Sequence, residues 1–243
     1  MSRVLVLVLV VARPMSAAAQ EPDRLGAFRE GTVQLSFGVR SGTCWAEDVT
    51  VIGTSCPCAG SVARVRLQLA GGRVVSFGVR ARASAVPLAA DSGGIQLGRI
   101  PAADAAKLLL ALAARGGAAG EEVVAAASMA DSAAVWPELL ELARNTHLAP
   151  DTRRAAIFWL SQAAGEAATR GLDSIATDSG TDRALREHAV FALSQRPADE
   201  AVPALLRIAR NNPDGAIRRK AVFWLGQTDD PRAVALFEEI LQH

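Results

Sequence analysis

A short apolar segment recurs three times in the second half of the chain at an almost constant interval. The segment AIFWLSQ at 156–162 returns as AVFALSQ at 189–195 and as AVFWLGQ at 221–227, at offsets of 33 and 32 residues. A second segment, WPELLELARN at 136–145, returns two intervals later as VPALLRIARN at 202–211. Each copy spaces its apolar residues as an amphipathic helix does. One pair of such helices cannot bury its apolar face alone, so the repetition predicts a stack of helical pairs.

Capping residues indicate where these helices begin. Asp151, Asp199 and Asp230 are the predicted N-caps, and Pro231 directly after Asp230 suits the first helical position. Pro203 lies within four residues of Asp199, where backbone N–H groups lack helical partners. We therefore expect Pro203 to be accommodated without breaking its helix.

The best copy of the repeat carries a family resemblance. The segment RKAVFWLGQ at 219–227, followed by DPRAV at 230–234, resembles the PBS-lyase-type HEAT-like repeat, and the resemblance extends over roughly 120–243. It implies an α-α superhelix, with protein–protein binding in most members and lyase or hydroxylase activity in a few. We expect residues 101–243 to be a HEAT-like helical repeat domain, with about four repeats after a leading helix at 102–115.

The first part of the chain has the alternation of β-strands. Val33, Leu35, Phe37 and Val39 alternate with polar residues, which is the pattern of a half-buried strand. Further strands are expected at 65–69, 75–79, 49–53 and 95–97, and the glycines at 71–72 predict a hairpin turn between the first two of these. Residues 20–100 thus predict a small antiparallel β domain with three cysteines. The whole chain is expected to be mainly α, an α-α superhelix preceded by this domain.

The N-terminus has the layout of a secretory signal. An apolar run at 4–12 follows Arg3, and the small residues at 17–19 precede Gln20. The run is too short to cross a bilayer, so no membrane span is expected in the mature chain. We expect a bacterial, exported protein, periplasmic or secreted, with residues 1–19 as the signal peptide. The alternative is an ordinary buried N-terminal strand.

Three cysteines lie close together in the predicted β domain, and export would place them where disulfides form. Cys56 and Cys58 are separated by one residue and are too close to pair comfortably with each other. We expect a disulfide from Cys44 to one of them, and the pattern does not choose between the two. A soft-metal site at these thiols is disfavoured because no histidine lies near them in the sequence.

Two sets of repeated residues are the candidate partner-binding sites. Phe158, Phe191 and Phe223 occupy a position that is often polar in the resembling family, and they form either an exposed recognition stripe or packing between repeats. The repeated arginines stand at the positive end of a helix dipole, which predicts a second role in binding carboxylates or in ion pairs with nearby aspartates. Arg154, Arg186 and Arg219 are the candidates among them. Trp159 and Trp224 are expected in the core.

Charge and histidine content narrow the function. The net charge is +1, without the basic excess typical of nucleic-acid binders, so no nucleic acid is expected as a partner. A HEAT-like metal-dependent hydroxylase would need several His-Glu pairs, and the chain has one reversed pair at 187–188. The three histidines suggest no catalytic set. We expect a non-catalytic scaffold for a protein or peptide, without metal or cofactor. The alternative is a regulatory or sensor subunit whose β domain binds a ligand.

Overall fold

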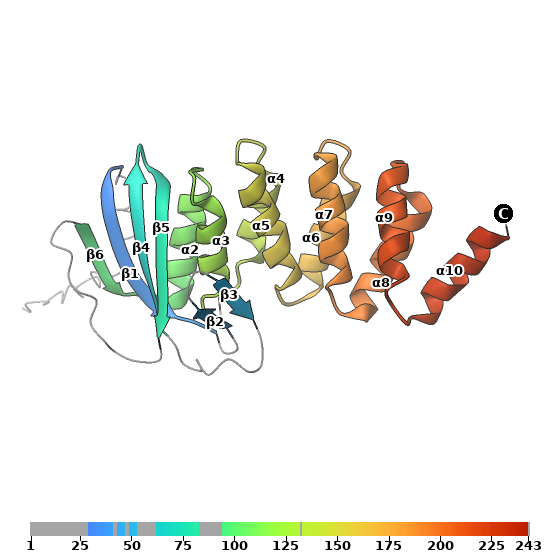
Figure 1. The fold of residues 1–243 in the computed structure, drawn as a ribbon, viewed down its shortest axis with the longest axis horizontal. Coiled ribbons are helices and arrows are strands. Elements are labelled where there is room, and N and C mark those ends of the chain that lie inside the picture. The colour runs from blue at the N-terminus through green and yellow to red at the C-terminus, as the bar shows by residue number, and fades with distance from the viewer. Residues whose placement is uncertain are drawn as a thin grey trace, which may run out of the picture.

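A sheet stands at one end of a row of helices, and the row runs to the C-terminus (Figure 1). The computed structural model describes residues 29–40, 43–46, 49–52, 62–82, 94–131 and 133–242. The strands are β1 (Gly31–Gly38), β2 (Thr43–Ala46), β3 (Val49–Ile52), β4 (Val62–Ala70), β5 (Arg73–Arg82) and β6 (Gly94–Arg99). The helices are α2 (Ala102–Ala113), α3 (Gly120–Ser128), α4 (Trp136–Arg144), α5 (Pro150–Ser161), α6 (Glu166–Thr177), α7 (Arg183–Ser194), α8 (Ala198–Asn211), α9 (Gly215–Leu225) and α10 (Pro231–Leu241).

The larger sheet has the strand order β5-β4-β1-β6. Strands β4 and β5 form the expected hairpin, and Gly71 and Gly72 at its turn have φ angles of 59° and 78°, which favour glycine. Strand β1 pairs antiparallel with β4, whereas β2 and β3 pair antiparallel in a separate two-stranded sheet.

The expectation of a purely antiparallel β domain is wrong, because β6 pairs parallel with β1. Thr32 is opposite Gly94, and Val33 is opposite Ile95. Alternation and glycine turns reveal strands joined by hairpins, but a parallel pair needs a long crossover and leaves no such local signal. Here the crossover contains the β4–β5 hairpin, and β6 leads directly into α2.

The sheet packs one face on the first helices. Strand β4 buries Val65, Leu67 and Leu69 and exposes Arg66 and Gln68 between them, as a half-buried strand should. The buried apolar residues of the sheet and of all the helices form one continuous cluster. The sheet and the helical pairs therefore share one hydrophobic core.

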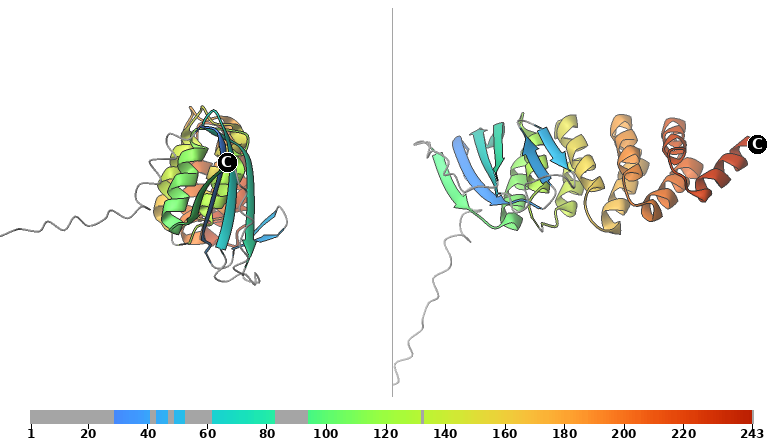
Figure 2. Two further views of the ribbon diagram at one scale, coloured as in Figure 1. Left: turned by 90° about the vertical axis from the view of Figure 1, so that its left-hand side faces the viewer. Right: turned by 60° about the horizontal axis from the view of Figure 1, so that its bottom comes forward.

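Main-chain hydrogen bonds join the sheet to the helices, and we call this contact the seam. The Arg40 N–H donates to the Met129 carbonyl at 3.1 Å, and the Asp131 N–H donates to the Gly38 carbonyl at 2.9 Å. The β5 side of the seam requires Gly117, whose φ is 134° and whose Cβ, if present, would overlap the Val74 carbonyl. Figure 2 shows the sheet standing across the end of the helical row.

The helices pack as consecutive hairpins, α2–α3, α4–α5, α6–α7 and α8–α9, with α10 against α8. Helix α5 also packs on α3 and α7, and α7 packs on α9, so that these helices form a close inner row. Neighbours in the outer row, α2, α4, α6 and α8, pack less closely. The helical solenoid predicted from the repeats is confirmed.

The predicted helix starts are confirmed at one position and wrong at two. The Asp230 side chain caps α10 by accepting from the Arg232 N–H at 2.9 Å. Asp151 and Asp199 lie inside the first turns of their helices, because α5 and α8 begin earlier, after Ala149 and Pro197. Pro203 is accommodated within α8, as expected.

Some sequence predictions lie outside the described residues. These include the signal peptide at 1–19, Cys56 and Cys58, and the side chain of Cys44, whose backbone belongs to β2. Within the part of the chain that the structure describes, no helix combines the length and apolar character needed to span a membrane.

Candidate partner-binding surface

Repeated hydrogen bonds set the loop that precedes each helix of the inner row. Asn145, Asp178 and Asn212 end the outer helices at equivalent points, and each side-chain oxygen accepts a backbone N–H two residues further on. These distances are 3.0, 2.9 and 3.0 Å. The turns therefore direct α5, α7 and α9 into the inner row in the same way.

Buried arginines then link one repeat to the next. Arg153 of α5, whose side chain is only 4 % exposed, donates from Nε to the Ala143 carbonyl at 2.9 Å and from Nη1 to the Asp182 carboxylate at 3.0 Å. Asp182 directly precedes α7. One guanidinium thus fixes the loop of its own repeat and the start of the next.

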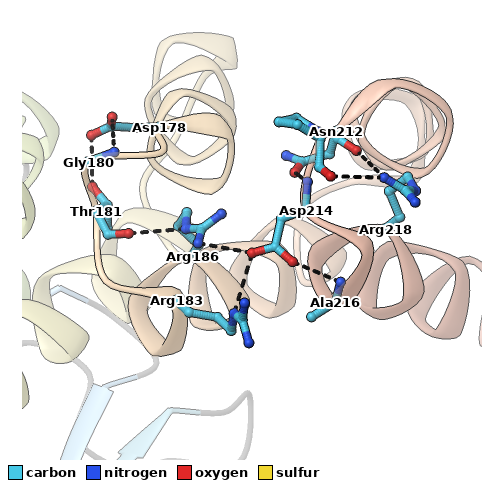
Figure 3. Close-up of polar contacts among 10 residues, drawn as sticks. Asp178, Gly180, Thr181, Arg183, Arg186, Asn212, Asp214, Ala216 and Arg218 are labelled. Carbon is cyan, nitrogen blue, oxygen red and sulfur yellow. Dashed lines mark hydrogen bonds and ion pairs between the residues drawn. The ribbon is translucent and has the colours of Figure 1, made fainter.

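Arg186 makes the same link one repeat later (Figure 3). Its Nε donates to the Thr181 carbonyl at 3.1 Å, and its Nη2 donates to the Asp214 carboxylate at 3.0 Å. Asp214 also caps α9 by accepting from the Ala216 N–H at 2.9 Å. The pKa of Asp214 is held below its usual range by that backbone hydrogen bond and by the charges of Arg183 and Arg186. We call the Arg153–Asp182 and Arg186–Asp214 pairs the ladder.

The three candidate arginines therefore have different surroundings. Arg186 belongs to the ladder, and its side chain is only 12 % exposed, so it takes the predicted ion pair between repeats. Arg154 is exposed and pairs with Asp151 of its own helix. Arg219 is exposed, and its guanidinium forms no hydrogen bond or ion pair with another described residue. Arg154 and Arg219 are the two that remain open to a partner.

The candidate phenylalanines lie on three consecutive helices of the inner row. Phe158 on α5 and Phe191 on α7 are half-buried, whereas Phe223 on α9 is 55 % exposed. The Trp224 ring lies 5.1 Å from Phe191 and 5.0 Å from Phe223, measured between centroids. His188 lies 5.8 Å from Phe191. We call His188, Phe191, Phe223 and Trp224 the α7–α9 aromatic cluster.

Sequence differences between repeats account for the different exposures. Trp224 covers Phe191 from the next repeat, but the position equivalent to Trp224 one repeat earlier is Ala192, which offers Phe158 no ring. Phe158 instead packs edge-on against Trp159 at 5.4 Å. Trp159 is 4 % exposed, which confirms its expected core position, whereas Trp224 is half-buried.

Two ring nitrogens of the cluster are buried without a hydrogen bond to any described residue, His188 Nε2 and Trp224 Nε1. The pKa of His188 lies below its usual value, because burial and the positive charge of Arg154 both lower it. A hydrogen bond to the Arg154 backbone raises this pKa by a smaller amount. Across the described residues, no group of three His, Cys, Asp or Glu side chains lies close enough to hold a metal ion.

One polar cluster was missed by sequence reasoning. Arg196, at the end of α7, donates to the carbonyls of Ser161, Ala163 and Gly165 and to the side chains of Thr169 and Glu200. It occupies the place directly after the repeated Ser-Gln pair, where the preceding copy of the repeat has alanine. The available signal in the sequence was an arginine that only one copy of the repeat has at this position. Its contacts tie the α5–α6 turn to the start of α8, which is a structural role.

Comparison with known proteins agrees with this arrangement of helical pairs. Residues 172–243, from within α6 to the C-terminus, match the family model for HEAT repeats. The match supports a HEAT-repeat protein. Searches of curated proteins and of solved structures gave no match.

Proposed function

We propose that this chain is a non-catalytic scaffold that binds a protein or peptide on the inner row of its HEAT repeats. HEAT repeats commonly serve as protein-interaction scaffolds, and their stacked helices offer an extended surface for a partner. The same proposal places the chain among PBS-lyase-type HEAT-like proteins of bacteria. Nucleic acid is not the proposed partner, because the net charge of +1 gives no basic excess.

The α7–α9 aromatic cluster is the observation that carries the proposal. A single exposed apolar residue is ordinary on a protein surface, but Phe223 continues into Trp224 and Phe191, which are both half-buried. Aromatic side chains that are partly buried before binding lose little further freedom when a partner covers them. The exposed Arg219 stands on the same helix, α9, and supplies a charge at the rim.

The proposed location is outside the cytoplasm, either periplasmic or secreted. The signal-like layout of residues 1–19 supports export, and the closely spaced cysteines suit an oxidising compartment. In that compartment Cys44 would pair with Cys56 or Cys58. Mass spectrometry of the exported chain under non-reducing conditions would identify the cleavage site and the bridge together.

Affinity capture from the cell-envelope fraction of the source organism tests the scaffold proposal. The exported chain serves as bait, with Phe223→Ser as the single exposed change and Phe158, Phe191 and Phe223 all changed to serine as the stronger variant. Val234→Ser on α10 is the matched control, since Val234 is 51 % exposed and lies outside the aromatic cluster. We expect a stoichiometric partner that both phenylalanine variants lose and the control retains. Equal capture by all folded variants would sink the proposal.

A further inference from the structure

A cleft of about 440 Å³ lies where the seam meets the first repeats. Arg40 lies on the sheet side, Trp136 at the start of α4, and Trp159 and Gln162 at the end of α5. Five alanines supply most of the remaining lining, and none of the lining residues that the structure describes is acidic. The volume and the largely apolar lining are typical of sites for small ligands.

Arg40 is the only charged residue among the described residues that line the cleft. Its backbone is fixed by the hydrogen bond to Met129, and its guanidinium carbon lies 5.5 Å from the centre of the Trp159 ring. Among the described residues no carboxylate forms an ion pair with it. Burial lowers the pKa of Arg40, although an arginine remains protonated at neutral pH. The cleft therefore holds a partly desolvated cation that lies over an aromatic ring and, within the part of the chain that the structure describes, has no paired carboxylate.

We propose that this cleft binds a carboxylate carried on a short apolar body, such as the C-terminus of a peptide or a free small carboxylic acid. A planar guanidinium matches a carboxylate with two parallel hydrogen bonds, which are strengthened where water is excluded. The alanines leave room for an aliphatic side chain, and Trp136 and Trp159 offer it apolar contact. The inference rests on the seam and is independent of the scaffold proposal, whose aromatic cluster lies on α7 and α9.

Charge balance favours a carboxylate over a phosphate or sulfate. One arginine neutralises one negative charge, and the described lining holds no second cation, so that a phosphate dianion would leave a charge buried without compensation. Gln162 supplies a side-chain amide to the cleft and donates from its Nε2 to Ser161 Oγ at 3.0 Å. Its carbonyl oxygen is then left to accept from a ligand N–H, as a peptide backbone would provide.

Binding of short peptides to the full chain tests the proposal. The probes are three hexapeptides that end in Ala, Val or Phe, each with a free C-terminus and with a C-terminal amide, together with N-acetylvaline. Titration calorimetry measures affinity, and tryptophan fluorescence reports on the two rings that line the cleft. At least one free-acid peptide should bind saturably, and its amide should bind at least tenfold more weakly. If N-acetylvaline binds as tightly as the free-acid peptide, the ligand is a small free carboxylic acid. If N-acetylvaline binds tenfold more weakly than that peptide, the ligand is the C-terminus of a peptide.

Two variants tie the binding to this cleft. Arg40→Gln should weaken the free-acid peptide at least tenfold, and Ala134→Trp, which fills the cleft from its exposed rim, should do the same without removing the charge. Arg73→Gln is the matched control, since Arg73 is an exposed arginine of the same sheet outside the cleft. The proposal would be overturned if none of the acids bound saturably or if acid and amide bound equally. It would also be overturned if binding were unchanged in both folded cleft variants.

Discussion

Two regions of the molecule withdraw an arginine from water, and they differ in how they do so: Arg196 is fully buried, whereas Arg40 is half-buried. Where the α5–α6 turn meets α8, Arg196 is satisfied by three carbonyls, a hydroxyl and a carboxylate. In the cleft beside the seam, Arg40 lies over an aromatic ring and pairs with no carboxylate of the described residues. Burial by itself therefore does not distinguish a structural arginine from a binding one. What distinguishes the two arginines is how many N–H donors of the guanidinium form hydrogen bonds within the protein.

The largest expected effect is the loss of the satisfied arginine. Arg196→Met should lower the free energy of unfolding by about 3 kcal/mol, because Glu200, Thr169 and three carbonyls lose their partner. Arg40→Met is the matched change and should stay within about 0.5 kcal/mol of the parent. Urea denaturation measures both. Equal losses would remove the distinction between the two arginines.

A somewhat smaller effect is expected at the seam. Gly117→Ala should cost about 2 kcal/mol, because the new methyl group meets the Val74 carbonyl and the backbone φ is positive. Gly78→Ala on β5 is the control, since a Cβ there meets nothing within 4 Å and the glycine has no positive φ. Thermal unfolding followed by circular dichroism compares them. A tolerated Gly117→Ala would show that the sheet can move away from the helices.

His188 of the aromatic cluster allows a test of a third partly buried polar group, by changing the pH. The pKa of His188 in the folded chain lies below the ordinary value of 6.5, so the unfolded chain takes up the proton first as the pH falls. Stability should therefore decline as the pH drops from about 6.5 toward the folded pKa. His188→Gln should flatten that decline between pH 7.5 and pH 5. An unchanged slope would mean that His188 is not protected from protonation in the folded cluster.

The smallest effect is expected at the exposed start of α10. Hydrogen bonds from the side chain and backbone of Arg232 lower the pKa of Asp230 to about 2, from an ordinary value of 3.8. The stabilisation is complete above pH 3.8 and is lost as the pH falls through about 2. Asp230→Asn keeps a capping oxygen but should lose this dependence. Helix content between pH 5 and pH 2 is the measurement, and parallel curves for parent and variant would contradict the assignment.

The sequence periodicity predicted the helical part of the fold well, because the same pattern of apolar residues occurs in each repeat. The apolar copies at 156–162, 189–195 and 221–227 lie in α5, α7 and α9, at the same position in each hairpin. The strand β6 was expected at 95–97, but its parallel pairing escaped prediction, since its partner β1 lies far away in the sequence and no turn joins them. Periodicity fixes which helices pair, but it carries no information about strands that meet through tertiary contacts.

The candidate residues were predicted less well, because equal positions in a repeat do not have equal neighbours. Phe191 is covered by Trp224, whereas the repeat that follows Phe158 has Ala192 at the position of Trp224 and offers no ring. Arg186 is held in the ladder, while Arg154 and Arg219 stay exposed. Arg40 belongs to no repeat, and only the packing of the seam against α5 brings it over Trp159. Residues of that kind are found from the structure alone.

The ladder has a consequence for how such a chain can change its length by gene duplication. Asp182 and Arg186 stand in the same repeat, so an inserted copy of that repeat brings both halves of the link with it. The preceding arginine meets the new aspartate, and the new arginine meets the aspartate that follows. Duplication or loss of a whole repeat in phase therefore leaves each ladder arginine with a carboxylate partner. A break between Asp182 and Arg186 would leave one of these charges without its partner.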